Sequence, residues 1–122
     1  MTDWATRDKA LVARLHDLLY SASVTRKSFF GNEAWFSDSN DQIFGQTWGV
    51  DVVLRLGGTN AAKLIDSQQM STFNPSGHRP KLEYVLLSQQ QDSNDKYLLD
   101  WLELAIRYAE SLPPKKKSRK GS

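Results

Sequence analysis

Histidine and acidic side chains are the groups in this sequence whose chemistry could support a metal site or acid–base catalysis. The two histidines, His16 and His78, lie 62 positions apart, and the chain has no cysteine. A zinc site needs several convergent ligands, which this pair does not supply. Asp38 and Asp41 belong to a run of five turn-forming residues, so we interpret them as turn residues whose side chains bond their own backbone. We therefore expect no metal site and no acid–base pair.

Sequence motifs for phosphate binding and nucleophilic catalysis are also absent. The chain contains no GxGxxG, no GxxxxGKS or GxxxxGKT and no GxSxG pattern. Small metal-dependent nucleases need an aspartate and an acid-x-lysine pair on adjacent strands, and the sequence Glu83-Tyr84-Val85 lacks that lysine. We therefore expect no catalytic residue and no cofactor, and a small enzyme is only the third hypothesis for function.

Positive charge is concentrated in the last ten residues, PPKKKSRKGS, at 113–122. The formal net charge of the chain is +2, whereas residues 1–112 carry 11 basic and 14 acidic side chains, which is −3. Dedicated nucleic-acid-binding domains usually carry positive charge on the fold itself. The tail could be a nucleic-acid arm, a nuclear localisation signal or a solvated extension, and we expect at most weak, non-specific nucleic-acid contacts. Those contacts would come from Lys115, Lys116, Lys117, Arg119 and Lys120.

Length and composition indicate one domain of ordinary globular type. The chain has 122 residues and 39% hydrophobic content, so we place a single domain at 1–112 and a flexible tail at 113–122. The longest apolar runs have four residues, whereas a membrane helix needs about 18 or more. The charged start MTDWATRDK does not resemble a signal peptide, and the lack of cysteine fits a reducing compartment. We expect a cytoplasmic protein that does not contact membranes.

The elements that would position these residues begin with an amphipathic helix. An apolar stripe at helical spacing, which includes Leu11 and Leu15, predicts a helix over 3–22. Thr2 or Asp3 is the expected cap, because either side chain can accept a hydrogen bond from a free backbone N–H.

Aromatic and β-branched residues predict strands in the next part of the chain. These strands are expected at 28–36, 42–48 and 51–56. Alternation places Phe44, Gln46 and Trp48 on one face of the second strand. One uninterrupted strand over 43–56 is the alternative, because Gly49 is the main signal for a turn between the two.

The second half of the chain adds a helix, a strand and a long final helix. A short helix is expected at 60–67, a loop at 71–80, a strand at 82–88 and a helix at 95–112. The sequence therefore predicts an α+β fold in two layers. Its antiparallel sheet is a three-strand meander plus at least one further strand, with the N- and C-terminal helices packed on one face.

The final helix has an unusually wide apolar surface. Its apolar arc is about 200°, well beyond the width that a surface helix needs. A helix set deeply in the core explains this arc, and contact with a second subunit is the alternative. Leu104 and Tyr108 lie on one flank of the arc, so they are the candidate residues for a homodimer. Ser93 or Asn94 is the expected cap of this helix.

The order of several short motifs resembles the TfoX N-terminal domain family. The matching stretches are VTRKSFFG at 24–31, VVLRLG at 52–57, GHRP at 77–80 and WLELAIRYAESLPPKKK at 101–117. The sequence departs from the family pattern at Phe29, Asn32 and His78. The family-matched positions that we single out are Phe30, Gly31, Arg55, Gly57, Arg79 and Pro80.

The resemblance implies a bacterial regulatory role. Full-length TfoX competence regulators look like transcriptional co-activators that act with the cyclic-AMP receptor protein, and this chain resembles a single-domain relative. We therefore expect a non-enzymatic regulatory or adaptor domain that binds a protein partner. A weak nucleic-acid-binding protein that uses the basic tail is the alternative. We expect Arg55 and Arg79 to hold the fold together through ion pairs or bonds to backbone carbonyls.

Overall fold

The computed structural model describes residues 8–29, 31–75, 77, 81–89 and 94–114. Within these ranges the chain forms a six-stranded sheet and three helices, so the predicted α+β class is confirmed. The first four strands form an antiparallel meander. They are β1 (Val24–Phe29), β2 (Asn32–Ser37), β3 (Ile43–Trp48) and β4 (Asp51–Arg55).

The meander has four strands where the sequence predicted three. The single strand expected at 28–36 is wrong, because the chain reverses around Gly31 and Phe29 pairs with Asn32. Gly31 has a φ of +83°, a conformation that glycine adopts at little cost. The alternative of one strand over 43–56 is also wrong, since Gly49 turns the chain with a φ of +64°.

Two further strands complete the sheet on the other side of β4. They are β5 (Ser71–Thr72) and β6 (Tyr84–Leu87), and the strand order is β1-β2-β3-β4-β6-β5. Every neighbouring pair is antiparallel. The loop expected at 71–80 is therefore wrong for its first two residues, which pair with β6 and form one edge of the sheet. At the other edge lies β1.

The helices are α1 (Lys9–Leu18), α2 (Gly58–Asp66) and α3 (Asp95–Glu110). The predicted cap of α3 is confirmed, since the Asn94 side chain accepts a hydrogen bond from the Tyr97 N–H at 2.9 Å. For α1 the predicted caps, Thr2 and Asp3, lie outside the described residues. Its N-cap is Asp8, whose carboxylate accepts from the Leu11 N–H at 2.9 Å.

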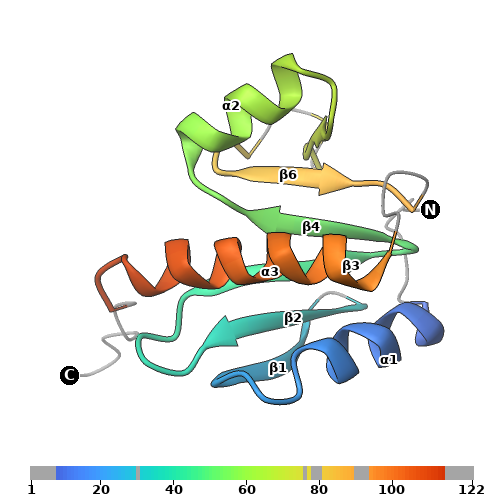
Figure 1. Cartoon of the computed structure of the whole chain (residues 1–122), viewed down its shortest axis with the longest axis vertical. Helices are drawn as coiled ribbons and strands as arrows, with labels where there is room; N and C mark the ends of the chain where they lie inside the picture. Colours follow the sequence, from blue (N-terminus) through green and yellow to red (C-terminus); the bar gives the residue numbers. More distant parts are fainter. Residues whose placement is uncertain (1–7, 30, 76, 78–80, 90–93, 115–122) are drawn as a thin grey trace.

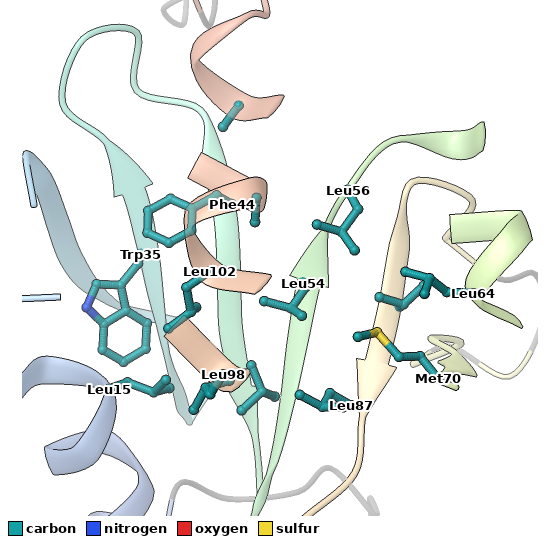
Figure 2. Close-up of a cluster of buried hydrophobic side chains, with 14 of the residues drawn as sticks. Leu15, Trp35, Phe44, Leu54, Leu56, Leu64, Met70, Leu87, Leu98 and Leu102 are labelled. Carbon is teal, nitrogen blue, oxygen red and sulfur yellow. The ribbon is translucent and has the colours of Figure 1, made fainter. Parts of the chain in front are cut away.

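All three helices contribute side chains to one hydrophobic core. Figure 1 shows α3 lying across the middle strands of the sheet. The helix α3 lies against β2, β3 and β4, and α2 lies against β6 and β5. Figure 2 shows the core side chains that meet between helices and sheet. They are Leu15 of α1, Leu64 of α2, Leu98 and Leu102 of α3, and Trp35, Phe44, Leu54 and Leu87 of the sheet. Burial of each such side chain contributes roughly 1.5–3 kcal/mol, which explains why the layers stay together.

A β-bulge in β3 changes which side of the sheet its side chains lie on, compared with the predicted alternation. Phe36 pairs with Ile43 and Trp35 pairs with Gly45, so Phe44 is an extra residue in β3. The fully buried Phe44 joins the helix-side core, whereas Gln46 pairs with Val53 on the opposite face. The expected grouping of Phe44 with Gln46 is therefore wrong, because a bulge breaks the alternation of a strand.

Candidate functional site

Arg55, one of the family-matched positions, lies at the end of β4 within a polar network. Its Nε donates to the Glu83 carboxylate at 2.8 Å, and its Nη1 donates to Gln42 Oε1 at 3.0 Å and to the Ile43 carbonyl at 3.2 Å. Only 16% of its side chain is exposed. These are the ion-pair and carbonyl contacts expected of an arginine that joins a loop to a sheet.

Tyr108 of α3 packs into the same network. Its ring centre lies 6.0 Å from the Arg55 guanidinium carbon, and a Cβ added at Gly57 would lie 2.8 Å from the ring. Partial burial and the nearby Glu83 carboxylate raise the pKa of Tyr108. Leu104 also packs against the core. The two candidate self-association residues are therefore both engaged within their own chain.

The loop between β2 and β3 holds the end of α3, a role that the sequence did not indicate. The buried Asn40 donates from Nδ2 to the Ala109 carbonyl at 2.8 Å and to the Leu112 carbonyl at 2.9 Å. Gln42 Nε2 donates to the Pro113 carbonyl at 2.7 Å. These amides supply additional donors to carbonyl groups at the end of α3, where the regular helical hydrogen bonds stop; the Ala109 carbonyl also accepts from the Leu112 N–H at 3.1 Å. The run of turn-forming residues predicted the turn but not its long-range partner.

Asn32, which departs from the family pattern, is a second buried polar link. Its Oδ1 accepts from Thr47 Oγ1 at 3.0 Å and from the Gly49 N–H at 3.1 Å. The side chain therefore joins the β1–β2 hairpin to the β3–β4 turn.

The family-matched positions do not form one site in the part of the chain that the structure describes. Gly31 lies at the end of the sheet where β4 begins. Arg55 and Gly57 lie at the other end of the sheet, where β4 ends. Phe30, Arg79 and Pro80 lie outside the described residues. The basic tail positions Lys115, Lys116, Lys117, Arg119 and Lys120 also lie outside them.

Asp38 and Asp41 both contact side chains of β1. Asp38 accepts from the Thr25 hydroxyl, and Asp41 lies 3.3 Å from Lys27 Nζ. Among the described residues, no cluster of three or more His, Cys, Asp or Glu side chains could hold a metal ion. The same residues include no helix with the length and apolarity needed to cross a bilayer.

An open groove lies between α1 and the β1 edge, and we call it the α1–β1 groove. It consists of two adjoining hollows, of about 420 and 230 Å³, which share His16 and Arg26. The larger hollow is lined by Lys9, Val12, Ala13, Asp17 and Glu33 in addition to the shared pair. Tyr20, Leu19, Ala22, Val24 and Trp35 line the smaller one with that pair. Tyr20 is 79% exposed and contacts His16 edge-on, so an aromatic surface is open to solvent here.

Beside this groove, β1 is an open strand edge. Within the described part of the chain it pairs with β2 alone, and residues 25–28 are exposed. Just before β1, the Asp38 N–H donates to the Ser23 carbonyl at 3.1 Å, which marks a hydrogen-bonded pair of the ladder. Because such pairs alternate along antiparallel strands, Thr25 and Lys27 direct their backbone groups toward β2. The N–H and C=O of Arg26 therefore point away from the sheet.

Comparisons with known proteins found no matching family model, no matching curated protein and no matching solved structure. The resemblance to the TfoX N-terminal domain thus stays a prediction from short motifs.

Proposed function

We propose that this protein is a non-enzymatic regulatory or adaptor domain that binds an extended segment of another protein along β1. The supporting observation is the open edge of β1 beside the α1–β1 groove. An extended peptide that joins a sheet edge gains main-chain hydrogen bonds, and its alternate side chains enter neighbouring pockets. The motif resemblance to a family of transcriptional regulators supports the regulatory part of the proposal.

The two edges of the sheet differ in what they offer such a segment. The strand β5 has two residues, whereas β1 has six. On the six-residue edge of β1, the N–H and C=O of Arg26 point outward, whereas the Val24 N–H donates to the Ala22 carbonyl at 3.0 Å. The α1–β1 groove lies on the side where Val24 and Arg26 direct their side chains. The edge of β1 is therefore the better docking strand.

Proline substitution at the edge tests this proposal. The full chain is immobilised, and lysate of the source organism is passed over wild type, Arg26→Ala and Arg26→Pro. Arg26→Pro removes an N–H that points away from β2, whereas Arg26→Ala keeps that N–H and removes only the side chain. We expect a retained protein that Arg26→Ala weakens and Arg26→Pro eliminates, with thermal stability similar in all three.

The captured protein is then identified, and a synthetic peptide of its retained segment must bind wild type but not Arg26→Pro. Capture that is equal for wild type and Arg26→Pro would contradict the proposal, because binding would then occur on another surface.

A further inference from the structure

We infer that the segment bound at β1 is acidic. It has two consecutive acidic residues, and an apolar residue lies two positions from the nearer of them, as in apolar–x–acidic–acidic or the reverse order. This inference rests on the proposed function and names the partner chemistry of the same site. Three features of β1 and its groove carry it: the charge of the strand, the facing of its two cations, and the partly apolar hollow beside Val24.

The charge of β1 is positive on both sides of the sheet. The strand VTRKSF contains Arg26 and Lys27 and no acidic residue. Arg26 pairs with Trp35 and faces the helix side, and Lys27 lies over the Phe36 ring at 4.6 Å on the opposite side. Neighbouring residues of an added strand also face opposite sides, so two consecutive acidic residues place one carboxylate near each cation.

Both cations are accessible to an incoming carboxylate. The side chain of Arg26 is 42% exposed and lies 3.7 Å from Glu33, and that of Lys27 is 51% exposed and lies 3.3 Å from Asp41. The Lys27–Asp41 pair is exposed on both sides and therefore weak, so Lys27 can exchange its acidic neighbour. Glu33 is only 12% exposed, so Arg26 keeps its contact with Glu33 and shares its charge with the incoming carboxylate. Glu33 and Asp17 line the larger hollow and disfavour a carboxylate inside it. The incoming acidic residue therefore belongs at the strand edge, opposite Arg26.

The apolar position follows from the smaller hollow. Val24, which lies two residues before Arg26 on the same face, lines this hollow with Trp35 and Tyr20. Side chains two positions apart on a strand are separated by roughly 6.6 Å, which matches the step from Arg26 to Val24 along the neighbouring strand. An apolar side chain at this point would cover the exposed ring of Tyr20.

The same charges disfavour a second copy of this chain as the occupant. Two β1 strands paired about a two-fold axis at Arg26 would place this residue opposite the same arginine of the second copy. Like charges directly opposite each other destabilise a strand pair, and basic residues on an edge strand protect it from self-pairing. An acidic segment converts this repulsion into attraction.

Fluorescence polarisation with short labelled peptides tests the inference. One peptide has the order apolar–x–Glu–Glu, which suits a parallel added strand, and a second has Glu–Glu–x–apolar, which suits an antiparallel one. Two controls keep the length: one separates the glutamates by one residue so that both face the same side, and one replaces them with lysine. We expect one patterned peptide to bind at least about tenfold more tightly than either control.

Charge reversal supplies a readout that does not depend on loss of binding. The double variant Arg26→Glu/Lys27→Glu should prefer the lysine peptide, and Arg26→Pro should bind neither patterned peptide.

Equal binding of the glutamate and lysine peptides would overturn the acidic preference. If that binding is still lost in Arg26→Pro, the proposed function stands. If no extended peptide binds and lysate capture is insensitive to Arg26→Pro, the proposed function fails as well. A dimer in sedimentation that Arg26→Pro dissociates would assign the edge to a second copy and overturn the inference.

Discussion

The ring of Tyr108 lies against the backbone of Gly57, so closely that an added Cβ would be 2.8 Å from the nearest ring carbon. Gly57 also has a φ of +92°, which side-chain-bearing residues rarely adopt. We therefore expect Gly57→Ala to lower the free energy of unfolding by about 1–3 kcal/mol, measured by chemical denaturation.

The adjacent glycine provides a matched control for Gly57→Ala. A Cβ at Gly58 has no neighbouring atom within 4 Å, and Gly58 begins α2, so Gly58→Ala should be neutral or slightly stabilising. Equal destabilisation by the two substitutions would show that the Tyr108 contact has no energetic role.

Arg55→Ala should destabilise the fold, because it leaves the Gln42 and Ile43 oxygens without the guanidinium that bonds them. Loss of charged hydrogen bonds of this kind costs roughly 1.5–3 kcal/mol, which should appear as a lower melting temperature. Arg55→Lys should retain only part of the stability that Arg55→Ala loses, since one ammonium group cannot reproduce the forked donor geometry of a guanidinium. An unchanged melting temperature for Arg55→Ala would instead favour a binding role for Arg55.

Removal of the Asn40 amide should release the end of α3. Asn40→Ala removes the side-chain donor that bonds both the Ala109 and the Leu112 carbonyls, although the Ala109 carbonyl keeps its bond from the Leu112 N–H. We expect a loss of about 1–3 kcal/mol in unfolding free energy.

Asn40→Asp adds a pH signature. The two carbonyl oxygens repel an ionised carboxylate, so the pKa of the introduced carboxyl group should rise on folding. The destabilisation caused by Asn40→Asp is then present above the pKa of this carboxyl group in the folded state. It disappears as the pH falls below the pKa in the unfolded state, because the protonated acid can donate a hydrogen bond to a carbonyl. A stability difference from wild type that does not shrink at low pH would contradict this account.

A pair of proline variants tests which backbone groups of β1 face β2. Thr25 directs its N–H toward β2, so Thr25→Pro should remove a ladder hydrogen bond and lower the melting temperature by several degrees. Arg26→Pro should stay close to wild type, because the Arg26 N–H points outward. Thermal denaturation compares the two variants. A lower melting temperature for Arg26→Pro than for Thr25→Pro would show that Arg26, and not Thr25, directs its N–H toward β2.

Deletion of residues 115–122 should leave the melting temperature unchanged and remove retention on DNA at low salt. The deleted sequence has no apolar side chain to bury and carries five basic residues. Five phosphate contacts would give a log–log salt slope of about −4.5 at most. Tight DNA binding by the truncated chain, measured by polarisation at two salt concentrations, would identify the folded domain as a nucleic-acid reader.

The helices were easier to predict than the strands because their signals are local. Apolar spacing indicated α1 and α3, and Asn94 was one of two expected caps for α3. The hairpin at Gly31 was missed because aromatic residues flank the glycine on both sides, so the pattern continued across the turn. The bulge at Phe44 left no signal, since it depends on the register with β2.

Long-range polar partners could not be predicted for a similar reason. Asn40 bonds carbonyls 69 and 72 positions away, and nothing in its local sequence distinguishes it from a simple turn residue. The same holds for the α1–β1 groove, which needs a helix and two strands in place. The residues of β1 were noted as a motif, VTRKSFFG, but their position at an open edge is a property of the sheet order.

The sequence separation between α3 and the meander sets an order of events during folding. The hairpins from Val24 to Arg55 join residues close in the chain, so their loops close at little entropic cost. Leu98 and Leu102, which cover the same strands, follow more than 40 residues later. While the ribosome is still synthesising α3, the apolar side of the meander has no final cover. This interval is when the nascent chain is most exposed to aggregation, and the cations of β1 protect its open edge throughout it.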